Sequence, residues 1–247
     1  MKSNEGPCVL CGSEGTLVDC HIYPRAFAKR MGHDNDPPRQ LSSDPSEHSK
    51  RMRTGWYDPA LVCQACESRF SEWDDYGIRF NRSEPELRYP EGRPYAIASW
   101  RDVDCRRLKL FALSTLWRAH ATTLEAFRHV RLGPHGIKLG GMIREGFEGD
   151  LDEFALTIAL FPDRPEPGML IPPSRCRITP KRLRAWRFQL DSMLFTIKVD
   201  GRPYPMNSRR LLVGSDKDVL AVVGRFDRSP EARFMTKWFG LRGEPGF

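Results

Sequence analysis

The stretches that decide the fold are two cysteine knuckles, CVLCG at residues 8–12 and LVCQAC at residues 61–66. Each C-x-x-C spacing puts two sulfurs on one tight turn, and Gly12 fits such a turn because a side chain there would crowd the backbone. Thiolates at tetrahedral corners are the preferred ligands of structural zinc. We therefore predict one zinc ion that ties two distant hairpins together, with buried free thiols as the alternative. The predicted ligands are Cys8, Cys11, Cys63 and Cys66.

Short elements surround the knuckles. The sequence predicts a strand over residues 16–21 and a helix that starts at Pro24, where a missing N–H does no harm. Residues 32–55 are polar, rich in Pro, Ser and Asp, and are expected to form an exposed loop. After the second knuckle, apolar residues recur at near-helical intervals up to Phe80, which predicts a helix with one buried stripe.

Composition excludes several classes of protein. The 247-residue chain is 40% hydrophobic and 29% charged, an ordinary balance for a globular protein rather than a disordered one. No apolar run approaches the roughly 20 residues that a membrane span needs, and the first residues lack the apolar segment of a signal peptide. Seven cysteines without a secretory signal argue against a disulfide framework. We expect a soluble cytoplasmic protein without a membrane partner.

The rest of the chain predicts a second domain. Residues 82–94 hold three prolines without apolar periodicity and suggest a linker with a boundary near residue 95. The expected fold class is α+β: residues 1–94 form a zinc-stabilised domain, and residues 95–247 form a basic domain with a helical segment and then an antiparallel, β-rich part. The helices are expected over residues 102–130, 135–145 and about 230–239; the strands are expected over residues 154–161, 168–173, 185–199, 210–214 and 218–226.

Charge is uneven along the chain. Of the net charge of +7, residues 1–100 carry −2, from 13 Lys and Arg against 15 Asp and Glu, and the remainder carries +9. An arginine-rich surface favours contact with phosphate, so we predict a nucleic-acid partner; a solvated surface or a protein partner bound through residues 101–247 are the alternatives. In RCRITPKRLRAWR, arginines could follow a nucleic-acid backbone while a tryptophan stacks on a base, unless the segment is an ordinary turn. The residues concerned are Arg175, Arg177, Lys181, Arg182, Arg184 and Trp186.

The ordered set CVLCG, then HIYP at residues 21–24, then LVCQAC resembles the HNH (ββα-metal) endonuclease superfamily, in its zinc-knuckle form. The resemblance covers residues 8 to about 80. Together with HIYPRAF, CESRFSEWDDY and a later FALSTLWR, it is similar to a group of bacterial proteins associated with phage defence. The resemblance implies a ββα-metal fold around a zinc ion, hydrolysis of phosphodiester bonds and a role in antiviral defence.

The resemblance also implies roles for individual residues. His21 matches the general base that activates water, and a divalent ion, Mg²⁺ or Mn²⁺, would stabilise the scissile phosphate. The sequence departs from the family pattern at Cys20, where an acidic residue usually precedes the histidine, and at Glu67, where Asn or His usually follows the last cysteine. A carboxylate can bind Mg²⁺, so Glu67 and Asp74, on nearly one helix face, are the candidate catalytic ligands.

Alternatives remain for each of these positions. His21 could be a core histidine bound to a backbone carbonyl, and Glu67, Asp74 and Asp75 could form a solvated acidic face. The middle Asn of the family has no match, although Asp58 lies near its place, and His48 in the polar loop could swing over a substrate. Two functions follow: a metal-dependent endonuclease acting on DNA, or a zinc module without catalytic activity that binds nucleic acid or a protein.

Overall fold

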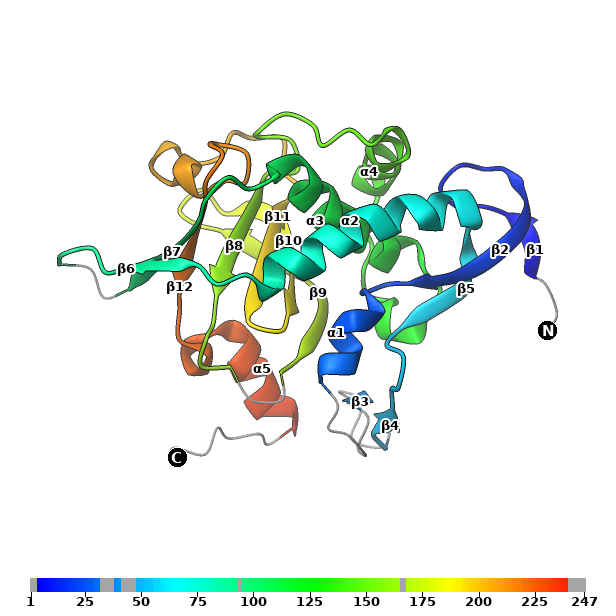
Figure 1. The fold of residues 1–247 in the computed structure, drawn as a ribbon, viewed down its shortest axis with the longest axis horizontal. Helices are drawn as coiled ribbons and strands as arrows, with labels where there is room; N and C mark the ends of the chain where they lie inside the picture. The colour runs from blue at the N-terminus through cyan, green and yellow to red at the C-terminus, as the bar shows by residue number, and fades with distance from the viewer. Residues whose placement is uncertain (1–3, 32–37, 41–47, 93–94, 165–167, 240–247) are drawn as a thin grey trace.

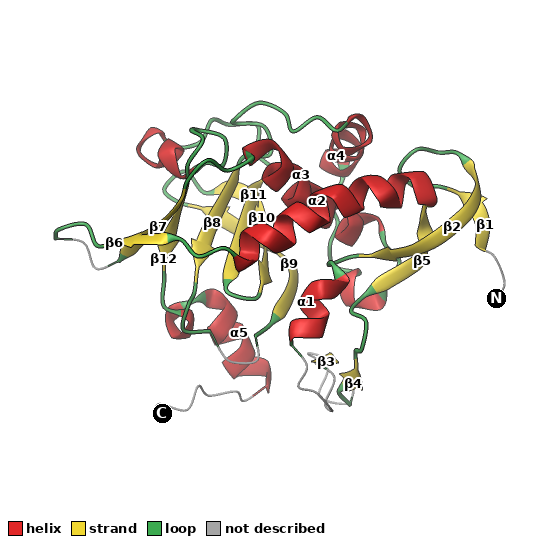
Figure 2. Ribbon diagram, in the orientation of Figure 1, coloured by secondary structure: helices red, strands yellow, loops and turns green. Residues whose placement is uncertain are grey.

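The computed structural model describes the whole chain except residues 1–3, 32–37, 41–47, 93–94, 165–167 and 240–247. Two main sheets lie at opposite ends of an elongated molecule, and helices fill the space between them (Figure 1). Helices and strands are both abundant, and the larger sheet is mostly antiparallel, so the predicted α+β class is confirmed (Figure 2). Among the described residues, no helix is long and apolar enough to cross a membrane.

The elements have the following bounds. The strands are β1 (Asn4–Pro7), β2 (Glu14–His21), β3 (Arg39–Gln40), β4 (Lys50–Arg51), β5 (Tyr57–Cys63), β6 (Glu86–Arg88), β7 (Ala96–Trp100), β8 (Leu156–Leu160), β9 (Leu170–Ile178), β10 (Leu183–Leu190), β11 (Met193–Lys198) and β12 (Val219–Val223). The α-helices are α1 (Arg25–Arg30), α2 (Gln64–Arg82), α3 (Cys105–Ala121), α4 (Pro134–Glu145) and α5 (Pro230–Phe239). The 3₁₀ turns are η1 (Glu125–Phe127), η2 (Met206–Leu211) and η3 (Phe226–Arg228).

The smaller sheet has the order β1-β2-β5 and is antiparallel throughout. In the β2–β5 register Leu17 lies opposite Cys63 and His21 lies opposite Tyr57, so the histidine and the start of the second knuckle share one strand pair, while the first knuckle lies in the turn between β1 and β2. α2 begins one residue after Cys63. The succession of two antiparallel strands and a helix therefore brings both knuckles and His21 together.

The larger sheet has the order β6-β7-β12-β8-β11-β10-β9. Its pairings are antiparallel except for β12 with β8, which run parallel. β6 and β9 are its two edges. One face of this sheet packs against α3, which contacts β9 and β11.

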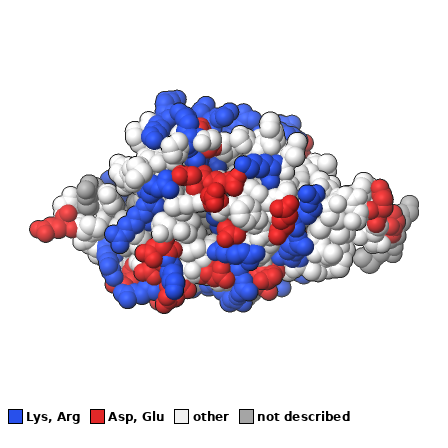
Figure 3. Space-filling model, turned by 90° about the horizontal axis from the view of Figure 1, so that it is seen from above, with Lys and Arg blue, Asp and Glu red and all other residues white. Residues whose placement is uncertain are grey.

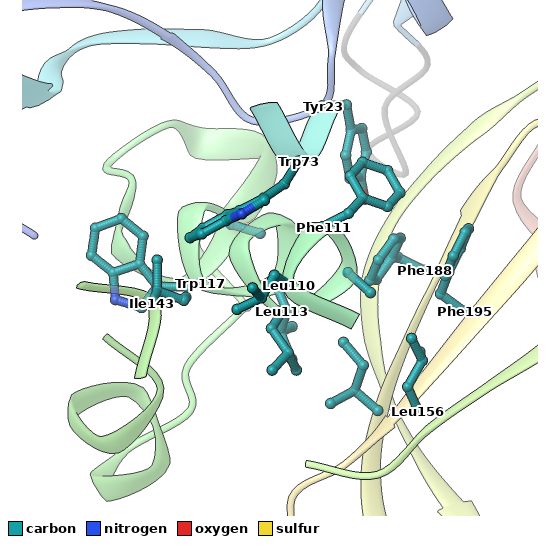
Figure 4. Packing of buried hydrophobic residues seen from close by; sticks show 14 of the residues in the cluster. Tyr23, Trp73, Leu110, Phe111, Leu113, Trp117, Ile143, Leu156, Phe188 and Phe195 are labelled. Atoms are coloured by element: carbon teal, nitrogen blue, oxygen red, sulfur yellow. The ribbon is translucent and has the colours of Figure 1, made fainter. Parts of the chain in front are cut away.

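α3 lies between α2 and the larger sheet. Every residue from Leu108 to Ala119 is buried, as expected for a helix that is surrounded by protein. The Phe111 ring contacts Phe195 of β11 edge-on, with ring centroids 5.9 Å apart (Figure 4). On its other side α3 approaches α2 closely, because a Cβ atom at Gly77 would lie 2.5 Å from the Phe111 ring. One cluster of buried residues consequently runs from Cys8 to Ala221.

Several expectations for the second half need correction. The helix expected over residues 102–130 ends at Ala121, because Thr122 takes an extended conformation and a short 3₁₀ turn follows. Residues 185–199 form two strands, with a turn at Asp191, whose φ of 55° is one that Asp tolerates. Residues 210–214 are not a strand: the apolar run is buried, but it lies at the end of η2. A short apolar run does not by itself distinguish these outcomes.

The first half differs from expectation mainly in its connections. The segment predicted as a linker contains β6, and the boundary predicted near residue 95 falls between β6 and β7, which pair in one sheet. The polar loop of residues 32–55 contains the small β3–β4 pair, while residues 32–37 and 41–47 lie outside the described part of the chain. The strand before His21 and the helices after Pro24 and Cys63 are confirmed.

Candidate metal centre and His21 site

The four knuckle cysteines converge on one point. Their sulfur atoms all lie within 4.8 Å of one another. Cys8 Sγ is 3.7 Å from Cys66 Sγ, and Cys11 Sγ is 3.8 Å from Cys63 Sγ. A tetrahedron with Zn–S bonds of about 2.3 Å has edges of about 3.8 Å. The arrangement is therefore compatible with a structural zinc ion, and in the described part of the chain it is the one group of three or more metal-binding side chains this close together.

Backbone geometry shapes the first knuckle. The Gly12 N–H donates to the Cys8 carbonyl over 2.8 Å, and Gly12 has a φ of 78°, which strains any residue with a side chain. The Val9 N–H donates to the Leu61 carbonyl, which joins the two knuckles directly. Hydrogen bonds from Ser13 lower the pKa of the Cys11 thiol to about 6, so this ligand is readily deprotonated. Burial acts in the opposite direction on Cys66 and raises its pKa.

His21 ends β2 and faces the protein rather than bulk water. Its Nε2 atom is buried and has no hydrogen-bond partner. Burial, followed by the positive charges of Arg118 and Arg25, lowers the pKa of the imidazole below its usual value. The ring lies beside Tyr57, with centroids 5.9 Å apart. The side chain is therefore a neutral imidazole at pH 7, with one nitrogen whose capacity for hydrogen bonding is unused.

Glu67 stands on the first turn of α2, directly after the last cysteine. One of its carboxylate oxygens, Oε2, is buried and has no hydrogen-bond partner. Burial raises the pKa of this carboxyl group, whereas Arg118, the Cys20 thiol and the His21 backbone N–H lower it. Cys20 itself is fully buried, and burial raises its pKa, as expected for a core thiol. Glu67 thus lies next to the β2 end that carries His21, with an oxygen available to a cation.

Asp74 has a different environment. Both of its carboxylate oxygens accept hydrogen bonds from Arg118, from Nη1 over 2.8 Å and from Nη2 over 2.7 Å. The arginine is fully buried and its Nη1 also donates to the His21 carbonyl over 2.6 Å. A catalytic cation at Asp74 would have to displace this bidentate pair. Arg118, which sequence reasoning did not single out, instead fixes the helix and the histidine strand to each other.

Asp58 joins β5 to the end of α3. One carboxylate oxygen accepts from the Ala60 N–H over 2.9 Å, and the other accepts from the Thr122 hydroxyl over 2.6 Å and from the Thr123 N–H over 3.3 Å. The side chain is buried and fully engaged. It therefore joins the start of β5 to the end of α3.

The remaining candidates lie elsewhere. His48 and Asp75 are exposed, and neither belongs to the group around His21 in the described part of the chain. The basic residues proposed for nucleic acid lie on the β9–β10 hairpin, far along the chain from His21. Five are exposed: Arg175, Arg177, Lys181, Arg182 and Arg184.

Trp186 does not have the predicted role. Only 3% of its surface is exposed, so its ring is not available for stacking on a base. The Arg175 guanidinium covers it instead, 5.4 Å from the ring centroid. On the hairpin Arg184 lies directly opposite Arg177, and the Asp200 carboxylate supplies a counter-charge 3.9 Å from the Arg184 Nε atom. On the face drawn in Figure 3, positive and negative side chains alternate and do not form one large basic patch.

We compared the chain with known proteins. No family profile, no curated protein and no solved structure matches it.

Proposed function

We propose that the protein is a metal-dependent endonuclease of the HNH type that cleaves DNA, with His21 as the general base. One observation carries the proposal: a neutral imidazole with an unpartnered nitrogen lies at the end of β2, in a sheet that the cysteine cluster ties to the start of α2. A general base needs an unprotonated nitrogen near pH 7. A role in antiviral defence belongs to the same proposal and rests on the sequence resemblance alone.

Two metals enter the proposal. Zinc would be held by Cys8, Cys11, Cys63 and Cys66, whose spacing fits it. The catalytic divalent ion, Mg²⁺ or Mn²⁺, would be held by Glu67, which has a free oxygen, together with oxygens of the substrate phosphate. Mg²⁺ commonly binds through one or two carboxylates, water and phosphate. When bound, such an ion supplies charge stabilisation for the cleaved phosphodiester.

The residues of the chain have separate tasks in this proposal. His21 Nε2 takes a proton from the attacking water. Arg118 holds the His21 carbonyl and Asp74, and so fixes the end of β2 against α2 without contacting the substrate. The exposed arginines of the β9–β10 hairpin would contact DNA phosphates.

The test is cleavage of plasmid DNA by the zinc-loaded protein with Mg²⁺, with Mn²⁺ or with EDTA. We expect metal-dependent nicking that falls by at least about a hundredfold in His21→Ala, since general bases typically contribute 10²–10⁴-fold. His135→Ala is the matched control, because this histidine lies on α4 and contacts the Phe154 ring edge-on. Equal cleavage by wild type and His21→Ala would refute the assignment of the base.

A zinc module without catalytic activity is the second candidate. It is supported by Cys20 in the place of an acidic ligand and by the complete engagement of Asp74 with Arg118. In this case His21 would be a buried structural side chain and the cysteine cluster a scaffold for binding. A folded, zinc-loaded protein that binds DNA yet cleaves none with any divalent ion would favour this candidate.

A further inference from the structure

The β6–β7 hairpin projects from the body of the molecule as an arm (Figures 1 and 2). It carries three of the large hydrophobic side chains that are exposed in the described residues: Leu87 at 45%, Tyr89 at 78% and Tyr95 at 38%. The side chains of a projecting hairpin pack against few other residues. Contiguous exposed apolar groups on a protein surface commonly mark an interaction site. The exposed apolar side chains of the arm are therefore a candidate contact surface for another molecule.

β6 is an open edge of the seven-stranded sheet. It pairs with β7 on one side, Leu87 lying opposite Ala98, and in the described part of the chain no strand pairs with its other side. An edge strand offers unpaired N–H and C=O groups to another strand. β6 is only three residues long, so its side chains must select the partner.

The sequence of β6, Glu-Leu-Arg, is complementary to itself in an antiparallel arrangement. If two copies meet with Leu87 opposite Leu87, then Glu86 of each copy lies opposite Arg88 of the other. A shift of two residues in either direction instead opposes Glu86 with Glu86 or Arg88 with Arg88, which is unfavourable. Of these registers, only the one centred on Leu87 gives two opposite-charge pairs without a like-charge pair.

The charged side chains of β6 are exposed and can exchange their present partners for those of a second copy. Glu86 contacts Arg88 over 3.1 Å and Arg101 over 2.9 Å within the chain, and these side chains are 46–66% exposed. Exposed ion pairs of this kind contribute little to stability and exchange readily. A second copy could therefore recruit Glu86 and Arg88 without breaking buried contacts.

The same register places an aromatic ring beside a proline. Tyr89 of one copy comes opposite Pro85 of the other, on the strand face that also carries Leu87. Tyr89 is 78% exposed in the single chain, so strand pairing and the burial of this ring would occur together in a symmetric contact.

We propose that the protein forms a two-fold dimer through antiparallel pairing of β6 with β6 of a second copy, with each Tyr89 against Pro85 of the other. The contact joins the two larger sheets into one. It is independent of the proposed nuclease activity, because it uses neither the cysteine cluster nor His21.

Sedimentation velocity and light scattering of the full-length protein over a concentration series test the proposal. We expect a species of twice the 28.4 kDa chain mass for the wild type. Glu86→Arg or Arg88→Glu alone should weaken association by about tenfold or more, because each turns two attractive pairs into repulsive ones. Arg128→Glu, which reverses one charge of the exposed Glu125–Arg128 pair, is the matched control and should leave the dimer intact.

A mixing experiment separates this contact from local effects on the fold. The Glu86→Arg chain presents two arginines and the Arg88→Glu chain presents two glutamates, so an equimolar mixture restores every cross-strand pair. We expect the mixture to form a heterodimer at concentrations where neither variant associates alone. A wild type that stays monomeric at every concentration, or variants and mixtures that associate as the wild type does, would overturn the proposal.

Discussion

The three-stranded sheet and the seven-stranded sheet differ in how much apolar side chain they bury. β1 has no buried position, and the apolar residues buried by β2 and β5 are few and mostly small. In contrast, β11 buries every residue except Thr196, and its Phe195 stacks on Phe188 with ring centroids 5.2 Å apart. Because burial of apolar area is the main stabilising contribution to folding, the smaller sheet needs another source of stability. The cysteine cluster at its end fits that need.

The two regions are joined by polar contacts as well as by packing. Arg118 of α3 reaches both Asp74 of α2 and the His21 carbonyl of β2. Tyr23, just after β2, donates from its hydroxyl to the Ile171 carbonyl of β9 over 2.9 Å. Loss of the metal should therefore destabilise the smaller sheet, and loss of the buried ion pair should destabilise the junction between the two regions. A change in the close packing of α2 against α3 should have a smaller effect on stability.

Removal of the metal should give the largest effect. Structural zinc contributes an apparent 10–16 kcal/mol, in order of magnitude, in small zinc domains at neutral pH. Chelation, or Cys63→Ser, should therefore expose the amides of β1, β2 and β5 to hydrogen exchange, while β8, β10 and β11 stay protected. Mass spectrometry of exchange in the metal-loaded and chelated protein measures this.

Cys105→Ser is the control for the chelation experiment, since Cys105 lies outside the cluster and contacts the Asp216 carbonyl. It should retain the metal and the exchange pattern of the wild type. Persistent protection of β2 and β5 after complete loss of the metal would remove the proposed difference between the sheets.

Arg118→Ala should have the next largest effect. It leaves the buried Asp74 carboxylate without a partner, and breaking a buried ion pair in this way costs about 3–5 kcal/mol. Urea unfolding of the metal-loaded protein gives the free energy. The double replacement Arg118→Met with Asp74→Leu removes both charges and should recover most of the loss, whereas the exposed control Arg128→Ala should change little. If Arg118→Ala lowered the free energy of unfolding by less than about 1 kcal/mol, the ion pair would not be an important link between the two regions.

Gly77→Ala should have the smallest of these effects. The added methyl group would lie 2.5 Å from the Phe111 ring, so α2 and α3 must move apart at a cost of about 1–3 kcal/mol. Gly141→Ala in α4 is the matched control, because open space surrounds that position and alanine favours helix. The two urea midpoints should move in opposite directions; equal shifts would show that close packing at Gly77 is not limiting.

Local patterns in the sequence predicted much of this structure. The C-x-x-C spacing predicted which sulfurs meet, and periodicity predicted α2, α4 and the strands around β8 and β12, because each signal is contained in a few neighbouring residues. The environment of Asp74 could not be predicted in the same way. Its partner Arg118 lies 44 residues further along a helix whose other positions are mostly apolar, and no spacing rule connects them.

The errors in the predicted end of α3 and in the predicted role of Trp186 also arise from contacts between residues that are far apart in the sequence. α3 ends where Thr122 meets Asp58, a contact across 64 residues of sequence. Trp186 is buried although it lies among arginines, because Arg175 lies opposite it on the neighbouring strand and covers the ring. The sequence singled out Glu67 and His21 as candidates, but their unpartnered atoms are visible only in three dimensions.

Arg118 holds a residue that lies much earlier in the chain, so the contacts around the end of β2 can be completed only late in synthesis. The arginine that holds the His21 carbonyl lies 97 residues after the histidine. Once both cysteine knuckles of a nascent chain have left the ribosome, their four sulfurs can come together on a metal ion. The chain still lacks α3, the helix that fixes the end of β2. A chain that stops before α3 therefore lacks the contact that holds the His21 carbonyl, and the end of β2 is fixed only after residue 118 has been synthesised.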